Sequence, residues 1–302
     1  MSNRIPVILD TDIGSDIDDA VALAYLLRQP GCELVGITTV SGDVVQRAAC
    51  AEVICREAGA PNIPIHTGVS NVLLTGPGQP NVPQYAGIKH RPHRTDYPAN
   101  TAVDFLRQTI RRRPGEITLL SIGPLANIAL LFALDPEIPS LLKSFVSMAG
   151  IFFPDRAQAG GGPYKIHREW NVFIDPVASA MVYSAKVPGH ISIGLDVTTK
   201  CQMPAEQVRQ RFAAKPLNIV LEMAEVWFQH AKTICFHDPL AAAIIFQPDL
   251  CTYQTGRVNV PVDANPHTFG QSLFTADPAG PHRVAQHVDP ARFFEHYFGF
   301  FT

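Results

Sequence analysis

Short apolar runs rich in β-branched residues alternate along the chain with longer stretches in which apolar positions recur at helical spacing. Near the N-terminus, strands are expected at 7–9, 33–40 and 62–66, and helices at 20–27 and 44–58. Short continuous apolar runs are typical of strands buried on both faces. The regular strand–helix–strand order predicts a parallel sheet joined by right-handed crossovers.

The same alternation continues towards the C-terminus. Further strands are expected at 116–122, 143–150 and 190–195, and further helices at 100–113, after 124, and at 176–184, 204–213, 217–232 and 290–301. From 252 to 288, short alternating strands between Gly and Pro turns indicate a small β-meander. We therefore predict a single large α/β domain over 1–302, with a mostly parallel, Rossmann-like central sheet flanked by helices and a small C-terminal β-meander.

Two segments interrupt this pattern and are expected to be active-site loops, at 75–98 and 154–168. The first contains five Pro and three Gly, and a loop this long inside a compact domain is usually functional or disordered. The second is rich in Gly at 160–162 but lacks the G-x-G-x-x-G spacing. A dinucleotide-binding site is therefore excluded.

Composition narrows the class of partner. The formal net charge is only −3, so no overall field favours binding to nucleic acid or to an anionic membrane. No apolar run is long enough to span a bilayer, no signal peptide is expected, and the six cysteines form no C-x-x-C pair. We expect a cytoplasmic protein with buried, reduced thiols and with no nucleic-acid or membrane partner.

Acidic residues crowd the turn after the first expected strand. The stretch between Pro6 and Leu27 has no Lys or Arg but holds five aspartates: Asp10, Asp12, Asp16, Asp18 and Asp19. Such close like charges raise one another's pKa and cost stability unless a positive charge sits among them. A helix N-terminus supplies only about half a charge, whereas oxygen ligands on a tight turn suit Ca²⁺ or Mg²⁺. One or two of these residues can be helix caps, but the group predicts a metal site at the carboxyl end of the strand.

A strand ending in D-T-D-x-G and followed by D-D-A-x-A-L resembles the N-terminal signature of the nucleoside hydrolase family, inosine-uridine preferring type. Later motifs follow in the family's order: G-P-L-A-N from Gly123, M-A-G from Met148, E-W-N from Glu169 with a following Asp-Pro, and H-D-P-L-A from His237. The turn between D-T-D and D-D-A is two residues longer than the commoner family spacing. The resemblance spans Asp10 to Asp238 and implies the nucleoside hydrolase type of fold.

The resemblance also implies a reaction, which is calcium-dependent hydrolysis of the N-glycosidic bond of ribonucleosides to free base and ribose. Carried over by motif position, the Ca²⁺ ligands would be Asp12, Asp19, the backbone carbonyl of Ile122, and Asp238. Asp12 would also act as the general base, and His237 would face the leaving base. The substrate is a small nucleoside, and we expect a homodimer or homotetramer, as is usual in such families.

The substrate contacts that the resemblance implies are Asp18, Asp43, Met148, Glu169, Trp170 and Asn171. Because the first turn is longer than usual, the roles of Asp16 and Asp18 can exchange. Asp43 stands where family members often carry an Asn that holds the sugar, but it can equally be a plain helix N-cap. Both interpretations of Asp43 remain open from the sequence.

Two other functions remain as alternatives. One is a non-catalytic nucleoside- or ribose-binding protein that retains the calcium site. The other is a phosphatase of the haloacid-dehalogenase type, which also begins with D-x-D after a strand, although the late H-D-P-L and E-W-N motifs would then be unexplained. An EF-hand is excluded, because Gly14 and Val21 occupy positions five and twelve of a loop that starts at Asp10.

Overall fold

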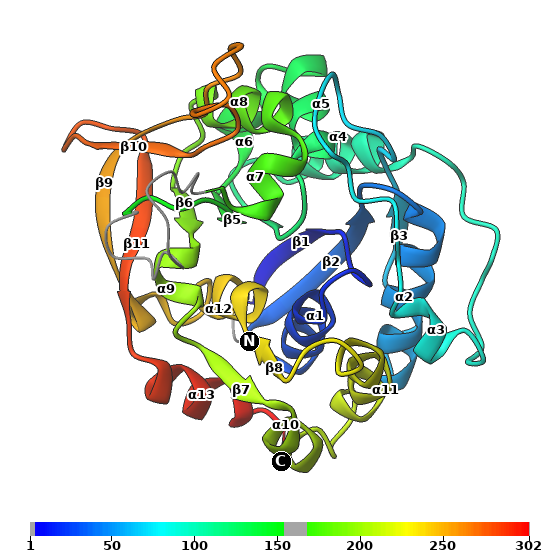
Figure 1. Ribbon diagram of the computed structural model, residues 1–302. Coiled ribbons are helices and arrows are strands. Elements are labelled where there is room, and N and C mark those ends of the chain that lie inside the picture. Colours follow the sequence, from blue (N-terminus) through cyan, green and yellow to red (C-terminus); the bar gives the residue numbers. More distant parts are fainter. Residues whose placement is uncertain (1–3, 154–167, 302) are drawn as a thin grey trace.

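The computed structural model describes residues 4–153 and 168–301 (Figure 1). The loop expected at 154–168 therefore lies outside the described residues except for Arg168. A nine-stranded sheet crosses the molecule in the order β10-β9-β11-β6-β5-β4-β1-β2-β3. Its strands are β1 (Ile5–Thr11), β2 (Cys32–Thr39), β3 (Ile65–Thr67), β4 (Thr118–Ser121), β5 (Ser144–Met148), β6 (His190–Ile193), β9 (Cys251–Asn259), β10 (Leu273–Ala276) and β11 (His282–Val288).

Most of this sheet is parallel. The strands from β3 through β2, β1, β4, β5 and β6 to β11 pair in parallel, while β9 pairs antiparallel with both β11 and β10. The predicted parallel sheet is thus confirmed, and the C-terminal segment expected as a β-meander is antiparallel, with its strands in a different order from that of a meander. In that segment β9 lies between β10 and β11, and β11 joins it to the main sheet through β6. A separate two-stranded sheet pairs β7 (Gln202–Pro204) with β8 (Thr233–Cys235).

Helices cover both faces of the sheet (Figure 1). One layer consists of α1 (Asp18–Arg28), α2 (Val44–Glu57), α11 (Leu217–Trp227), α12 (His237–Ala243) and α13 (Pro290–Phe298). The other consists of α4 (Ala102–Arg112), α5 (Ala126–Leu134), α6 (Ile138–Leu141) and α8 (Pro176–Ser184). Shorter helices are α3 (Tyr85–Ile88), α7 (Trp170–Ile174), α9 (Leu195–Thr198), α10 (Ala205–Arg211) and the 3-10 turn Pro248–Leu250.

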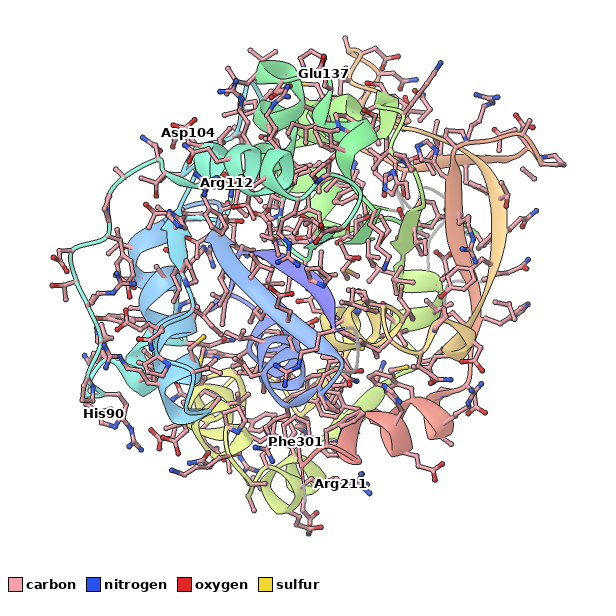
Figure 2. All side chains as sticks on the ribbon, turned by 180° about the vertical axis from the view of Figure 1, so that it is seen from behind. His90, Asp104, Arg112, Glu137, Arg211 and Phe301 are labelled. Atoms are coloured by element: carbon pink, nitrogen blue, oxygen red, sulfur yellow. The ribbon has the colours of Figure 1, made fainter. Side chains whose placement is uncertain are left out.

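Each face of the sheet has its own hydrophobic core, and β1 contributes to both. Val7 and Leu9 pack under α1, α2 and α12, whereas Ile8 packs with α4, α5 and α8 on the opposite face. All three side chains are fully buried, as expected for a short apolar run in a central parallel strand. Charged residues such as Asp104 and Arg211 lie at the rim of the molecule (Figure 2).

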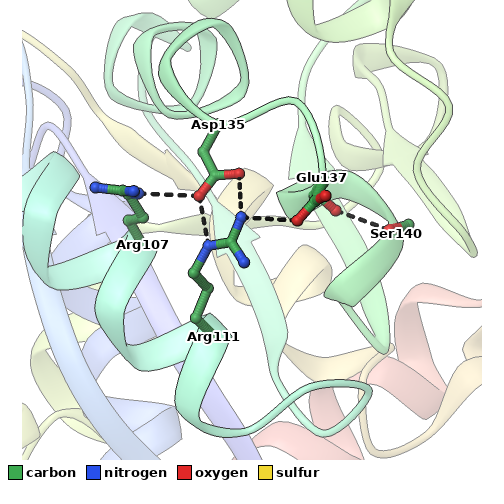
Figure 3. A network of polar contacts seen from close by, with 5 residues as sticks. All are labelled: Arg107, Arg111, Asp135, Glu137 and Ser140. Atoms are coloured by element: carbon green, nitrogen blue, oxygen red, sulfur yellow. Dashed lines mark hydrogen bonds and ion pairs between the residues drawn. The ribbon is translucent and has the colours of Figure 1, made fainter.

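The helix layer over Ile8 is tied together by an ionic network (Figure 3). The carboxylate of Asp135, which follows α5, accepts hydrogen bonds from Arg107 at 2.9 Å and from Arg111 at 2.6 Å, both on α4. Arg111 also binds Glu137 at 2.9 Å. Hydrogen bonds from Arg111 and Arg107, opposed by desolvation, hold the pKa of Asp135 well below its usual range, so the network is charged at neutral pH and keeps α4 against α5.

The expected helices and strands are present, with ends that differ by a few residues. The helix expected at 217–232 ends at Trp227, because the chain turns there into β8 and the Trp227 indole donates to the Thr233 carbonyl at 3.0 Å. None of the described helices is both long and apolar enough to cross a membrane. All six cysteines are free, and five of them are buried.

Candidate active site

A cavity of about 300 Å³ lies beyond the carboxyl ends of β1, β4 and β5. Every site residue predicted from the sequence lines it, apart from Asp43. The lining residues are Asp12, Ser15, Asp16, Asp18, Asp19, Gln79, Ile122, Met148, Glu169, Trp170, Asn171, Leu195, Trp227, His237 and Asp238. This is the edge at which parallel α/β sheets bind ligands.

Three carboxylates converge where α1 and α12 begin. Ligand oxygens of Asp18, Asp19 and Asp238 lie within 4.8 Å of one another, and all three residues are buried. The Asp238 main-chain N–H donates to Asp18 Oδ2 at 3.1 Å, and the Thr11 hydroxyl donates to Asp19 Oδ1. The first turns of two helices that are far apart in the sequence therefore meet at one point.

Burial makes this cluster electrostatically costly without a cation. Burial, followed by the neighbouring carboxylates, raises the pKa of Asp18, Asp19 and Asp238 well above its usual range. Burial also raises the pKa of Asp12, which the Arg47 guanidinium opposes. A divalent cation would neutralise such a cluster, and its donors are all oxygen atoms, the ligands that hard cations prefer. The residues present therefore fit a calcium ion.

Asp12 packs against the peptide that follows β4. A Cβ atom on Gly123 would lie 2.9 Å from Asp12 Oδ1 and 2.8 Å from the Asp12 nitrogen. Such distances are too short for any side chain, so glycine is required here. Asp12 and Ile122, whose carbonyl the family resemblance implies as a metal ligand, both line the cavity.

Asp10, the first Asp of D-T-D, has a structural role and does not line the cavity. Its carboxylate accepts hydrogen bonds from the Asn127 amide at 2.7 Å and from the Thr38 hydroxyl at 2.5 Å. Burial raises the pKa of Asp10 to about 7. Asn127 also donates to the Thr39 carbonyl and accepts from the Val69 N–H, so the Asn of G-P-L-A-N ties β1, β2 and the chain after β3 together.

Glu169 and Asn171 line the cavity from the start of α7. The Glu169 carboxylate caps α7 and accepts from the N–H groups of Asn171, Val172 and Gly150 at 2.7, 3.0 and 3.0 Å. The Asn171 amide donates to the carbonyls of Ile122 at 2.9 Å and Met148 at 3.1 Å. This use of its nitrogen leaves the Asn171 side-chain oxygen available for a hydroxyl group in the cavity.

His237 and two tryptophans line the remainder of the cavity. His237 Nδ1 pairs with the Thr198 hydroxyl at 2.7 Å, which leaves Nε2 for a ligand. Burial lowers the pKa of His237 to about 4. Trp170 is half exposed at 50%, and Trp227 reaches the cavity from the end of α11.

The residues that line this cavity belong to a sequence that matches a known protein family. Residues 7–295 match the model of the family described as inosine-uridine preferring nucleoside hydrolase. The chain belongs to this family.

Individual relatives support the assignment. The chain is 31% identical to a non-specific ribonucleoside hydrolase of Escherichia coli, covering 82% of this chain and 81% of that protein. It is 28% identical to uridine nucleosidase 1 of Arabidopsis thaliana, covering 84% and 77%. A solved plant nucleoside hydrolase shares the fold with a TM-score of 0.83 at 24% identity over 99% of both chains.

The predicted reaction class is therefore confirmed: the chain is an enzyme that hydrolyses the N-glycosidic bond of ribonucleosides. A family match over almost the whole chain leaves no basis for the haloacid-dehalogenase alternative, and it sets aside the non-catalytic binding protein.

Asp43 is the one predicted contact that the structure places elsewhere. Its side chain accepts from the Gln46 N–H at 2.9 Å and caps α2, and it does not line the cavity. Of the two interpretations left open by the sequence, the N-cap is the one observed. The capping bond uses one carboxylate oxygen, and the substrate contact of Asp43 stays a prediction.

Sequence reasoning missed the positive charge in the nucleoside hydrolase site. Arg47, on α2, is fully buried beneath the acidic turn. The sequence near the aspartates contains no Lys or Arg between Pro6 and Leu27, and Arg47 lies on the next helix. A signal was present, because Arg47 shares a helix face with Ala51 and Ile54, both buried. Gln79 was also missed as an individual residue, although it belongs to the expected loop at 75–98 and lines the cavity.

Proposed function

We propose that this enzyme is calcium-dependent and releases free base and ribose. The observation that carries the proposal is the buried carboxylate cluster of Asp18, Asp19 and Asp238, which shares its cavity with Asp12 and Asn171. Asp12, Asp19, Asp238 and the Ile122 carbonyl would hold the ion. When bound, calcium would neutralise these carboxylates and orient the ribose hydroxyls and the attacking water.

Asp12 would act as the general base. It lines the cavity, is 5% exposed, and is placed by the contact of its backbone and carboxylate with Gly123. A general base must lie within hydrogen-bond reach of the proton that it accepts. Water attack at the anomeric carbon builds positive charge on the sugar, and the surrounding carboxylates would stabilise that charge.

Asp18 and Asn171 would bind the sugar. The Asp238 N–H fixes one Asp18 oxygen, and the Ile122 and Met148 carbonyls fix the Asn171 nitrogen. Each residue then presents one oriented oxygen to a ribose hydroxyl. Glu169 would act indirectly, because its carboxylate binds the backbone N–H groups of Gly150, Asn171 and Val172 and so holds Asn171 in place.

His237 would assist departure of the base. Thr198 occupies its Nδ1, so Nε2 is the nitrogen that can hydrogen-bond to the leaving group. We expect His237→Ala to slow hydrolysis of natural nucleosides by roughly 10²- to 10⁴-fold. A ribosyl substrate whose leaving group has a low pKa needs no proton and should lose far less activity. Equal losses on both substrates would remove His237 from this role.

The reaction is tested by identifying its products in ¹⁸O-labelled water with phosphate present. Hydrolysis predicts free base and ribose that carries one ¹⁸O at its anomeric carbon, observed by mass spectrometry after rapid reduction to ribitol. Ribose 1-phosphate as the product would contradict hydrolysis. Assembly as a homodimer or homotetramer and a cytoplasmic location stay predictions; sedimentation velocity tests the first, and cell fractionation tests the second.

A further inference from the structure

Arg47 is buried beneath the acidic turn and binds backbone groups rather than a carboxylate. Its side chain is fully buried, and among the described residues it takes part in no ion pair within 4.0 Å. Nε donates to the Ser41 carbonyl at 2.6 Å. Nη1 donates to the Asp12 carbonyl, to the Ile13 carbonyl at 3.1 Å and to Ser15 Oγ at 2.8 Å.

The remaining nitrogen reaches a different segment. Nη2 donates to the carbonyl of Gln79 at 2.9 Å, and Gln79 lines the cavity from the loop at 75–98. One guanidinium therefore joins the turn at 12–15, which carries Asp12, to the loop segment at 79–84. Its planar group of five donors suits several carbonyls at fixed angles, a geometry that the single ammonium of lysine cannot reproduce.

The same two segments also contact each other directly. The Gln84 N–H donates to the Gly14 carbonyl at 3.2 Å, and the Gln84 amide donates to the Ser15 carbonyl at 3.1 Å. The Ser15 hydroxyl donates to the Asn81 carbonyl at 3.2 Å. Gly14, with a φ of +106°, packs so closely on Val82 that a Cβ would lie 2.4 Å from it. The turn is thus enclosed by Arg47 on one side and by segment 79–84 on the other.

We infer that Arg47 is a positioning residue that couples segment 79–84 to the metal-binding turn at 12–15. Ligand binding at the turn then favours the ordered position of segment 79–84, and that position favours ligand binding, since coupling between two sites is reciprocal. The identity of the ligand as calcium rests on the proposed function, whereas the coupling between the two segments does not.

The first test compares amide hydrogen exchange in the wild type, Arg47→Met and Arg47→Lys, without metal. Arg56→Met is the matched control, because Arg56 lies on the same helix and is 46% exposed. We expect Arg47→Met to raise exchange at Gln84 and within 13–15 together, by about 10-fold or more, while Arg56→Met leaves both unchanged. Arg47→Lys, which keeps the charge, should give an intermediate increase at the same amides.

The second test measures calcium affinity by calorimetry on chelator-treated protein. Loss of a group that orients metal ligands typically costs about 10- to 100-fold in affinity, and we expect this loss for Arg47→Met. Ile54→Val, a buried change on the same helix, controls for lowered stability and should keep wild-type affinity. Calcium should also slow exchange at Gln84 in the wild type, and this protection should disappear in Arg47→Met.

The outcomes separate the two proposals. If the wild type binds no calcium, the proposed function fails, and the metal-free exchange experiment still decides the coupling. If exchange in Arg47→Met rises at 13–15 but not at Gln84, or rises equally throughout the chain, Arg47 is only structural and the coupling is overturned. Wild-type calcium affinity in Arg47→Met would overturn it as well.

Discussion

The Asp18 carboxylate accepts a hydrogen bond from the main-chain N–H of Asp238, 3.1 Å away, although 220 positions separate them in the sequence. Asp18 opens α1 and Asp238 lies in the first turn of α12, and these two helices pack side by side on one face of the sheet (Figure 1). The acidic cluster therefore exists only in the folded chain. Under the proposed function, binding of a cation by this cluster would therefore stabilise the fold.

Asp238→Asn should have opposite effects on the metal-free and calcium-bound protein. Without metal, it removes one of several buried like charges and should raise the melting temperature. Calcium at about 100 times its dissociation constant should stabilise the wild type by about 2.7 kcal/mol, but it should hardly affect Asp238→Asn. Thermal unfolding with calcium and with chelator measures both effects.

Asp249→Asn is the matched control for Asp238→Asn, because Asp249 is exposed and forms its ion pair with Arg292 at the surface. It should keep the full calcium response. If calcium did not change the melting temperature of the wild type, or if it stabilised Asp238→Asn as much as wild type, Asp238 would not be a calcium ligand.

Glu52 should contribute stability that disappears in acid. It is buried on α2 and accepts hydrogen bonds from Tyr97, Arg94 and Arg56. Burial raises the pKa of Glu52, but the combined effect of these hydrogen bonds is larger and lowers the pKa from 4.5 to about 2. A carboxylate with a lowered pKa stabilises the fold fully above its ordinary pKa and loses this effect as the pH falls towards the lowered value.

Glu52→Gln should therefore cost about 1–2 kcal/mol of unfolding free energy near neutral pH, after allowing for solvent screening by the half-exposed arginines. The difference from wild type should shrink between about pH 5 and pH 2 in urea unfolding. Glu225→Gln, in an exposed pair with Arg209, should cost much less at every pH. If the difference in unfolding free energy between Glu52→Gln and wild type stayed constant across this range, the charge of Glu52 would not be what stabilises the fold.

Ligand binding should change the tryptophan fluorescence directly. The chain has only two tryptophans, and both Trp170 and Trp227 line the cavity. Titration of ribose into Asp12→Asn should change the emission, and Trp170→Phe and Trp227→Phe should each remove part of the change. Saturable binding by calorimetry with unchanged emission would place the ligand outside this cavity.

Glu169→Gln should destabilise the protein and weaken substrate binding together. The carboxylate accepts three backbone N–H bonds, while an amide has one acceptor oxygen and would place its NH₂ group against an N–H. We expect a loss of about 1–3 kcal/mol in urea unfolding and a raised KM, because Asn171 loses its support. Wild-type stability would contradict the capping role.

Most of the sheet and the cavity could be predicted because the information is local. Each strand of the parallel core is a short apolar run, and the residues that follow β1, β4 and β5 belong to recognisable motifs. The family resemblance implied that Asp12 and Ile122 share one site, which agrees with the rule that ligands bind where parallel strands end at one edge of the sheet.

What the sequence left undecided depends on contacts between distant segments. Arg47 follows Asp12 by 35 positions in the sequence, yet its guanidinium donates to the Asp12 carbonyl and opposes the rise that burial causes in the pKa of the Asp12 carboxyl. The position of β9 between β10 and β11 is set by pairing partners, which alternation alone does not specify. Asp43 could not be assigned because the same residue type serves as a cap and as a ligand.

The most direct test of the central claim is ribose release from a panel of ribonucleosides by wild type and Asp12→Asn, after chelation and after calcium is restored. We predict that the chelated wild type is inactive, that calcium restores activity, and that Asp12→Asn stays inactive with calcium bound. Full activity in chelator, or wild-type turnover by Asp12→Asn, would contradict a calcium-dependent reaction with Asp12 as its base.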